Sequence, residues 1–474
     1  MGHARQLLTG VRVPASAAFL AIFLTLAVSA LAANSKETIL HQFNTAGDGK
    51  GPLATVIADK AGNLYGTTSV GGSSTNCGIV ALGCGTVFEL SPPAENGGSW
   101  TETILYSFQG GADGDGPNGL VFDAAGNLYG TTEAGGNGNC LSANGTAIGC
   151  GTVFELSPPT VAGGQWTEAV LYSFTGGADG AYPYAPMIFD HAGNLYSTAN
   201  NGGVVNCPAA SNGEATGCGT VFELTPPATS GGAWTESTLY AFQGGNDGGF
   251  PFSAGVVLSP TGKLYGANAF AGGTSEYCQS LGCGTVYELA PPKSKGGAWT
   301  ETVLHAFQEG TSTDPNVVTG GVILRGGALY GTTRYGGQNK FGAAFELTPS
   351  SGGTWTMNVI YSFYSGPGDA IDPEAGVVSD SKGNLWGTTL YGGKGTCNAG
   401  CGTVFELVPP STSGGTWTES VVYSFRGGNA GAGPFAGVTL SKGLLYGTTA
   451  SGGGGNGCSI LGRGGCGTVF SVVP

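Results

Sequence analysis

The chain has 474 residues, a formal net charge of −14 and 92 glycines, and only 10% of its residues are charged. This acidic balance, without any basic run, argues against binding to nucleic acid or to an anionic membrane, because both need clustered Lys and Arg. So much glycine could indicate disorder, but 40% of the residues are hydrophobic and the aromatic ones recur at fixed positions, which indicates a folded chain.

Residues 1–32 predict a signal peptide for export. Arg5 and Arg12 form a positive region, residues 17–31 are an apolar run, and residues 30–32 (Ala-Leu-Ala) are a small-x-small cleavage site. An uncleaved membrane anchor is the alternative, but the run is short for a bilayer span. No second apolar stretch is long enough to cross a membrane. We therefore expect a secreted or periplasmic mature protein without a membrane span.

Residues 53–108 predict four consecutive strands. The first is the apolar run 53–59, which ends in turn residues, and the second is 64–68. The third, 85–90, and the fourth, 100–108, are rich in β-branched and aromatic residues. No amphipathic helical period is found in the mature chain.

This unit of about 60 residues occurs seven times, each time around a phrase such as GNLYGTT. Four antiparallel strands repeated radially make a β-propeller blade. A linear solenoid is the alternative, but it needs capping repeats at both ends. The central aromatic residues of the seven phrases are Tyr65, Tyr129, Tyr196, Tyr265, Tyr330, Trp386 and Tyr446.

The two ends of the mature chain predict ring closure. Residues 37–43 (ETILHQF) match the fourth-strand phrase at 102–108 (ETILYSF), whereas the last repeat stops after its third strand, 467–472. The N-terminal strand can therefore complete the seventh blade, which removes exposed sheet edges. We expect an all-β, seven-bladed propeller of four-stranded antiparallel blades, with residues 33–474 as one domain, and a monomer.

Twelve cysteines form local pairs in the loops between the second and third strands, and the fifth repeat lacks both members, with Phe341 in the second position. A zinc site would need uniform spacing with His or further Cys nearby. After an export signal, this pairing predicts disulfides that pin the loops on one face. The pairs are Cys77/Cys84, Cys140/Cys150, Cys207/Cys218, Cys278/Cys283, Cys397/Cys401 and Cys458/Cys466.

Histidine offers little for catalysis. His41 and His305 replace the recurring fourth-strand Tyr and are expected to be packed or edge residues, and His191 lies in a predicted turn. No catalytic phrase such as GxSxG or HExxH is present. A Glu recurs in the third strand and another in the fourth, and we expect both rows to support the repeat as cross-strand partners. The fourth-strand row is Glu102, Glu168, Glu236, Glu301 and Glu419.

Five repeats carry an Asp four residues before a Pro, in the connection that leads into the next blade. We expect this connection on the face of the Cys loops, around the mouth of the central channel. A ring of Asp there could bind Ca²⁺, which prefers several hard oxygen ligands, or another polar ligand. The alternative, which recurrence favours, is a turn in which Asp bonds its own backbone. The row is Asp48, Asp113, Asp179, Asp247 and Asp369.

The residue after that Pro differs between repeats, and such differences are where a specific function is expected. Aromatic rings beside acids at a channel mouth are typical of a sugar-binding surface. The alternative is that the rings plug the channel or fill packing gaps. Repeats three and four also add Tyr182 and Phe250. The variable residues are Leu53, Asn118, Tyr184, Phe252, Asn316, Glu374 and Phe435.

The phrases GNLYGTT and GTVFELxP, at this spacing and after an export signal, resemble the Gloeo/Verruco (GloVer) extracellular tandem-repeat family of bacteria. The resemblance extends over nearly the whole mature chain. It implies a secreted or surface-attached, propeller-like protein, often with a C-terminal anchor. We expect this chain to depart from the pattern, since no anchor is visible after its last repeat. The family implies no defined reaction, so no catalytic residues are carried over.

We therefore expect a non-enzymatic extracellular binding or interaction module, for glycans or cell-envelope partners. Ligand-binding candidates are the Asp row, Glu374 and the aromatic residues Tyr184, Phe252 and Phe435. The rival is a hydrolase or lyase acting on extracellular polysaccharide, with Glu374, Asp372 or Asp115 as acid and base. A purely structural surface protein is a third alternative. No cofactor is expected, and only Ca²⁺ stays open as a metal.

Overall fold

The computed structural model describes residues within Glu37–Pro474. Within it, the description leaves out residues 45–46, 79–81, 96, 143, 162, 204–206, 208–216, 230, 273–281, 309–313, 365, 367, 413, 456–457 and 461–462. The predicted signal peptide and Cys278 lie outside the described residues.

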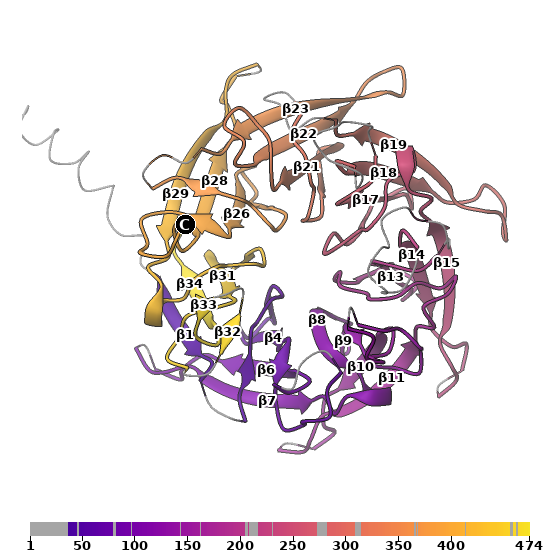
Figure 1. Ribbon diagram of the computed structural model, residues 1–474, viewed down its shortest axis with the longest axis vertical. Coiled ribbons are helices and arrows are strands. Elements are labelled where there is room, and N and C mark those ends of the chain that lie inside the picture. The colour runs from indigo at the N-terminus through magenta and orange to yellow at the C-terminus, as the bar shows by residue number, and fades with distance from the viewer. Residues whose placement is uncertain are drawn as a thin grey trace, which may run out of the picture. The chain divides into compact units, whose positions relative to one another are not determined.

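Seven four-stranded antiparallel sheets are arranged in a ring, with the first strand of each toward the centre and the last at the periphery (Figure 1). The predicted all-β, seven-bladed propeller is confirmed. From the inner to the outer strand, blade 1 contains β3 (Ile57–Ala58), β4 (Leu64–Thr68), β6 (Thr86–Ser91) and β7 (Thr101–Ser107); blade 2 contains β8 (Asp115–Phe122), β9 (Leu128–Ala134), β10 (Thr152–Ser157) and β11 (Thr167–Ser173); blade 3 contains β12 (Ile188–Phe189), β13 (Leu195–Ala199), β14 (Thr220–Thr225) and β15 (Thr235–Ala241).

The remaining blades repeat this order. Blade 4 contains β16 (Val257–Leu258), β17 (Leu264–Asn268), β18 (Thr285–Ala290) and β19 (Thr300–Ala306); blade 5 contains β20 (Ile323–Arg325), β21 (Ala328–Thr333), β22 (Ala343–Pro349) and β23 (Trp355–Ser362); blade 6 contains β25 (Val378–Ser379), β26 (Leu385–Thr389), β28 (Thr403–Val408) and β29 (Thr418–Ser424); blade 7 contains β30 (Thr439–Ser441), β31 (Leu444–Thr449), β34 (Thr468–Val472) and β1 (Thr38–Gln42).

Short elements decorate the connections. Among the described residues, three two-stranded ribbons and three 3₁₀ turns accompany the blades, and there is no α-helix. No helix described here has the length and hydrophobicity needed to cross a membrane. These elements are β2 (Gly49–Lys50) with β5 (Val70–Gly71), β24 (Ala370–Ile371) with β27 (Tyr391–Gly392), β32 (Ser459–Ile460) with β33 (Arg463–Gly464), and the turns Gly111–Asp113, Gly245–Asp247 and Gly428–Ala430.

The core lies between neighbouring blades and is built on aromatic pairs. The Phe that follows each outer strand packs edge-on against the third-strand aromatic ring of the next blade, at centroid distances of 4.9–5.4 Å. Such pairs contribute about 0.5–1.5 kcal/mol each beyond the area they bury. The second-strand residue beside the third-strand ring must have little or no side chain, because a Cβ on Gly66 would lie 2.5 Å from Phe88.

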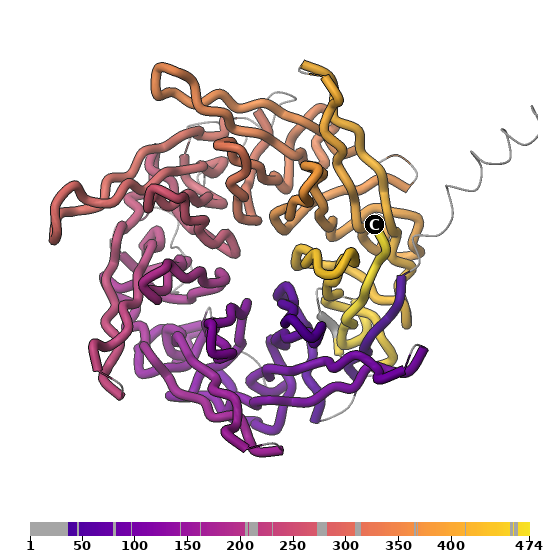
Figure 2. Tube along the Cα trace, turned by 180° about the vertical axis from the view of Figure 1, so that it is seen from behind, coloured from indigo at the N-terminus to yellow at the C-terminus, as the bar shows by residue number. Residues whose placement is uncertain are grey.

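The N-terminal strand closes the ring as predicted. β1 pairs antiparallel with β34, with Thr38 opposite Ser471 and Gln42 opposite Thr468. The first and last parts of the described chain therefore share one sheet, and both views show the indigo strand beside the yellow one (Figures 1 and 2). Phe43, which follows β1, then packs on Phe88 of blade 1 at 5.3 Å, so closure also joins blade 7 to blade 1.

The predicted disulfides are present wherever both cysteines are described. Each has a Cα–Cα distance of 5.0–5.3 Å, as an unstrained bridge requires. Cys283 is also disulfide-bonded. In blade 5 the loop has no cysteine, and Phe341 instead bridges to Gly336 and packs into the core. The bridges are Cys77–Cys84, Cys140–Cys150, Cys207–Cys218, Cys397–Cys401 and Cys458–Cys466.

Candidate functional site

Seven equivalent residues begin the inner segment of the seven blades, and we call them the lead-in positions. Each donates its backbone N–H to the carbonyl of the second cysteine, or of Phe341, in the preceding blade, and each has a φ between 55° and 70°. The lead-in positions are Gly51, Gly116, Tyr182, Phe250, Val317, Asp372 and Gly433.

Four consecutive blades, 3 to 6, place a residue other than glycine at this left-handed position. A non-glycine residue there costs on the order of 1 kcal/mol, and such strain clusters at functional sites. Tyr182 is buried and its hydroxyl donates to the carbonyl of Leu141 at 3.0 Å. The strain therefore marks one side of the ring as different from the other.

The lead-in positions correct the sequence alignment of blade 5. Asn316 follows a Pro and was expected to match Tyr184 and Phe252, but Val317 is the lead-in residue of that blade. Thr319 is therefore the counterpart of Tyr184, two residues after the lead-in position. Asn316 instead forms an isolated bridge with Tyr335.

Tyr184 and Phe252 lie against each other. Their rings lie 5.2 Å apart at an interplanar angle of 35°, and both are half-buried. The Tyr184 hydroxyl donates to Glu133 of blade 2 at 2.9 Å. Phe435 is half-buried in blade 7. The first two residues thus form an aromatic pair with an acid at its edge.

Glu374 takes part in a second cluster, which joins the residues after β21 in blade 5 to the start of the inner segment of blade 6. Arg334 lies 2.9 Å from Glu374, and its guanidinium stacks over Tyr335 at 5.0 Å. Burial raises the pKa of Glu374 and of Asp372, while Arg334 lowers both. Glu374 is only 3% exposed, whereas Tyr335 is 41% exposed. The ring and the guanidinium, rather than the Glu374 carboxylate, face solvent. We call Arg334, Tyr335, Asp372 and Glu374 the blade 5–6 cluster.

A second Arg–Tyr pair lies beside this cluster. Arg463 stacks over Tyr391 at 4.7 Å. Burial raises the pKa of Tyr335, and the nearby Tyr391 adds a smaller contribution in the same direction. Arg463 also donates to the carbonyl of Leu390 at 3.4 Å. Blades 5 to 7 therefore carry two neighbouring cation–π pairs, one of which lies beside Asp372 and Glu374.

The Asp row lies elsewhere than predicted. It was expected at the channel mouth, but each carboxylate accepts from the chain just after its outer strand, as Asp113 does from the Gln109 amide at 2.5 Å. After the outer strands of blades 1 to 3, the acid also accepts from the Tyr of that strand, at 2.7–3.0 Å. Asp48 and Asp369 also accept from the following amide, Gly49 and Ala370. The contacts of Asp48, Asp113, Asp179, Asp247 and Asp369 are therefore those of turns.

Each of these Asp residues also approaches the fourth-strand Glu of the next blade. Burial, with a smaller contribution from the neighbouring Asp, raises the pKa of four of these Glu residues to about 7. The residues are Glu168, Glu236, Glu301 and Glu419.

One such junction contains histidine. His41 lies between Asp48 and Glu102, and these three side chains form a candidate metal-ligating cluster in the described residues. Asp115, an acid considered for catalysis, instead accepts from the Gly78 amide in a disulfide loop at 2.7 Å and is 1% exposed.

A family model described as the Gloeobacter/Verrucomicrobia repeat matches residues 27–209, 208–395 and 268–474. The chain belongs to the Gloeobacter/Verrucomicrobia repeat family. The resemblance seen in the repeated phrases is thereby confirmed. No curated protein matches the chain.

Several solved structures are similar to this Gloeobacter/Verrucomicrobia repeat protein at low identity. An aldose sugar dehydrogenase from Streptomyces coelicolor is 10% identical, with a TM-score of 0.41, 93% of this chain covered and 99% of that one. A gluconolactonase from Xanthomonas campestris is 14% identical, with a TM-score of 0.35 and coverages of 77% and 90%. PorZ of Porphyromonas gingivalis is 13% identical, with a TM-score of 0.45, and the chain covers 47% of its length.

Within this repeat protein, sequence reasoning missed Glu133, Arg334 and Tyr335. A signal for the first two was present, because both follow the GTT phrase at a position where the other repeats differ. Glu133 and Arg334 each reach the residue two places after the lead-in position of the next blade. The sequence could have indicated these pairs only if the residue after GTT had been compared with the variable residue at the start of the next blade.

Proposed function

We propose that the mature chain is an exported, non-enzymatic module that binds glycans at a surface formed by blades 3 to 6. The observation that carries the proposal is the gathering of aromatic rings, charged groups and strained lead-in residues on these blades of an otherwise repetitive scaffold. Export rests on the N-terminal signal and agrees with the disulfides. A glycan or another cell-envelope molecule is the expected partner.

The chemistry of the blade 5–6 cluster supports a sugar ligand. A sugar ring stacks its apolar face on an aromatic ring and hydrogen-bonds its hydroxyls to charged groups around it. Tyr335 offers such a ring, and Arg334 stands over it with its side chain 31% exposed. The Tyr184–Phe252 pair with Glu133 offers the same combination on blades 2 to 4.

A glycan array with the secreted protein tests this proposal, and Tyr335→Ala is the decisive variant. We expect binding to some glycan class and a loss of about tenfold in affinity on removing the ring, since an aromatic contact contributes about 1.4 kcal/mol. Tyr364→Ala is the matched control, because Tyr364 is 48% exposed but follows an outer strand. Equal binding by all three proteins would exclude the blade 5–6 cluster as the binding surface.

A polysaccharide hydrolase or lyase is the second candidate function. Its support is that Asp372 and Glu374 are close enough to raise the pKa of Glu374, after burial as the main cause. Glycoside hydrolysis needs two carboxyl groups about 5–10 Å apart across the scissile bond. Bound glycans should then be cleaved, and Asp372→Asn should abolish cleavage while binding persists. Binding without products would leave the non-enzymatic function.

A further inference from the structure

The junction where the ring closes differs from the other blade junctions. At three of the others, the outer-strand Tyr donates directly to its Asp at 2.7–3.0 Å. Here His41 replaces the Tyr, and its Nε2 atom lies 3.5 Å from Asp48 Oδ2 and 3.7 Å from Glu102 Oε1. These separations are too long for ordinary hydrogen bonds.

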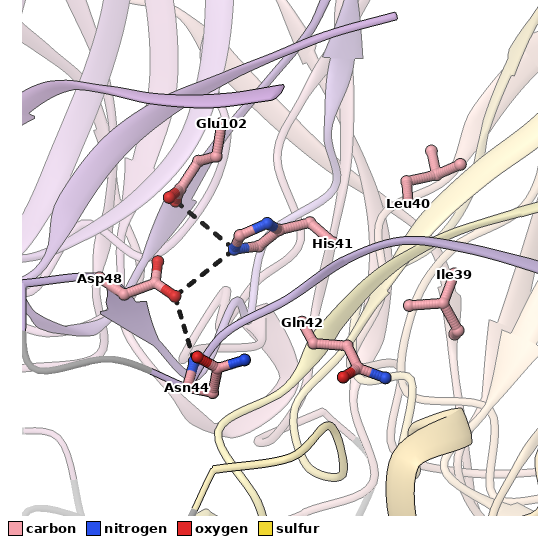
Figure 3. Close-up of a pocket in the computed structure, with 7 residues that line it drawn as sticks. All are labelled: Ile39, Leu40, His41, Gln42, Asn44, Asp48 and Glu102. Atoms are coloured by element: carbon pink, nitrogen blue, oxygen red, sulfur yellow. Dashed lines mark hydrogen bonds and ion pairs between the residues drawn. The ribbon is translucent and has the colours of Figure 1, made fainter. Parts of the chain in front are cut away.

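The converging atoms are buried without an ordinary hydrogen bond. Both His41 Nε2 and Glu102 Oε1 are inaccessible to solvent, and they meet only at the 3.5–3.7 Å separations given above. Leaving such polar groups buried and unpaired is unfavourable, because they lose their hydrogen bonds to water. The side chains of His41, Asp48 and Glu102 point toward one another and line a pocket of about 480 Å³ (Figure 3).

We propose that His41, Asp48 and Glu102 bind a divalent transition-metal cation of the zinc type. One imidazole and two carboxylates form a ligand set that zinc accepts, and the pocket leaves room for water as a fourth ligand. Ligand atoms about 2.1 Å from a tetrahedral ion lie about 3.4 Å apart, close to the two separations measured here. Ca²⁺ fits less well because it takes six to eight oxygen ligands.

The backbone holds the ligands in place. Asp48 Oδ1 accepts from the Gly49 amide at 2.9 Å, while Asp48 Oδ2, the atom nearest the imidazole, accepts from the Asn44 amide at 3.1 Å. Such contacts orient a ligating carboxylate. His41 belongs to β1 in blade 7 and Glu102 to β7 in blade 1. A bound cation would thus join the two blades at the non-covalent closure of the ring.

The chain contains its own control for this site. At the junction after blade 4, His305 also replaces the Tyr, but its Nε2 lies 2.9 Å from Asp314 in a direct hydrogen bond. Met357 occupies the place of Glu102, opposite Leu347 as Glu102 is opposite Leu90. The pair of His305 and Asp314 therefore lacks the second carboxylate.

The test uses the purified mature protein, freed of metal with a chelator and dialysed against Zn²⁺, with Co²⁺ as the coloured substitute. We expect one equivalent of zinc, a tetrahedral Co²⁺ spectrum and a higher melting temperature with zinc. His41→Tyr, which restores the residue of the other junctions, and Glu102→Gln should each weaken zinc binding by at least about tenfold. His305→Tyr should bind as the parent does.

Two results would overturn the assignment. Folded parent protein that binds no zinc at micromolar concentration has no such site. Zinc retained by both His41→Tyr and Glu102→Gln would be an adventitious ion only. Because two chemically different variants remove separate ligands, misfolding of one, seen by circular dichroism, leaves the other to decide. Glycan binding is scored separately, so either result is independent of the proposed function.

Discussion

The fourth-strand Glu residues occupy an environment that a repeated surface acid would not have. Glu168 has an Oε1 atom that is buried without a hydrogen-bond partner, and Asp113 of the preceding blade adds a like charge. Burial is the larger cause of its raised pKa. The same arrangement recurs at Glu301 with Asp247. A negative charge on these Glu residues therefore opposes folding.

The stability of the protein should depend on pH through this row. Because the folded-state pKa of Glu168, Glu236 and Glu301 is about 7, above the ordinary 4.5, the protonated groups favour the folded state. Their contribution is complete below about pH 4.5 and is lost as the pH rises to about 7. Discounted for solvent screening, the three groups together should change stability by about 1 kcal/mol.

The triple variant Glu168→Gln, Glu236→Gln and Glu301→Gln should weaken this dependence, while Glu419, whose pKa is also raised to about 7, retains its share. We expect its melting temperature to exceed that of the parent by about 2 °C at pH 8 and to match it at pH 4. The control is Glu95→Gln, which removes a charge from an exposed turn position. A triple variant that is less stable than the parent at pH 8 would show that these carboxylates stabilise the fold in their charged form.

Residue identity predicted only part of the two clusters. The variable Tyr184, Phe252 and Glu374 could be singled out because they break the repeat. Their partners Glu133 and Arg334 could not be assigned to them from the sequence, since a contact between blades depends on which residues the folded ring brings together. His41 could be seen to replace a Tyr, but Glu102 lies about 60 residues away, and its approach to His41 follows only from ring closure.

At the scale of elements, the repeated phrases predicted strands two to four to within about two residues. Residues 64–68 are β4 as expected. The first strand was predicted over 53–59 but pairs only at Ile57–Ala58. Its earlier part instead contacts the neighbouring inner segment, as Thr55 does by donating to the Gly437 carbonyl at 3.5 Å. Hydrophobic pattern does not distinguish pairing within a blade from packing between blades.

The disulfides should stabilise loops that already have their shape. Gly392 and Gly400 form a bridge beside Cys397–Cys401, and Gly336 and Phe341 form the same bridge in blade 5 without cysteine.

Replacing Cys397 and Cys401 by Ala should therefore keep the fold and lower the free energy of unfolding by about 2 kcal/mol, because the closed loop is short. Chemical denaturation measures this difference. Titration of the unfolded parent protein should find almost no free thiol, and several thiols would contradict the pairing.

At the scale of the whole molecule, the stabilising contacts are distributed around a ring. The ring is closed non-covalently at one place, between blades 7 and 1. Every junction uses the same Phe–aromatic contact, so no blade is distinguished by its core. The joint between blades 7 and 1 depends on β1, which supplies four register pairs to β34 and places Phe43 against Phe88. Opening it exposes the edge of β34 and separates two core faces.

Deletion of residues 33–43 should therefore greatly lower the melting temperature. The loss follows from the missing β1–β34 pairing, the lost Phe43–Phe88 contact and the freed edge of β34, which should also promote association in size-exclusion chromatography. A chain that begins at Glu37 is the matched control, since it keeps all of β1. If the longer deletion melts like this control and remains monomeric, closure contributes nothing to stability, and blades 7 and 1 must be held by their remaining contacts, such as Thr448 with the Ala54 carbonyl.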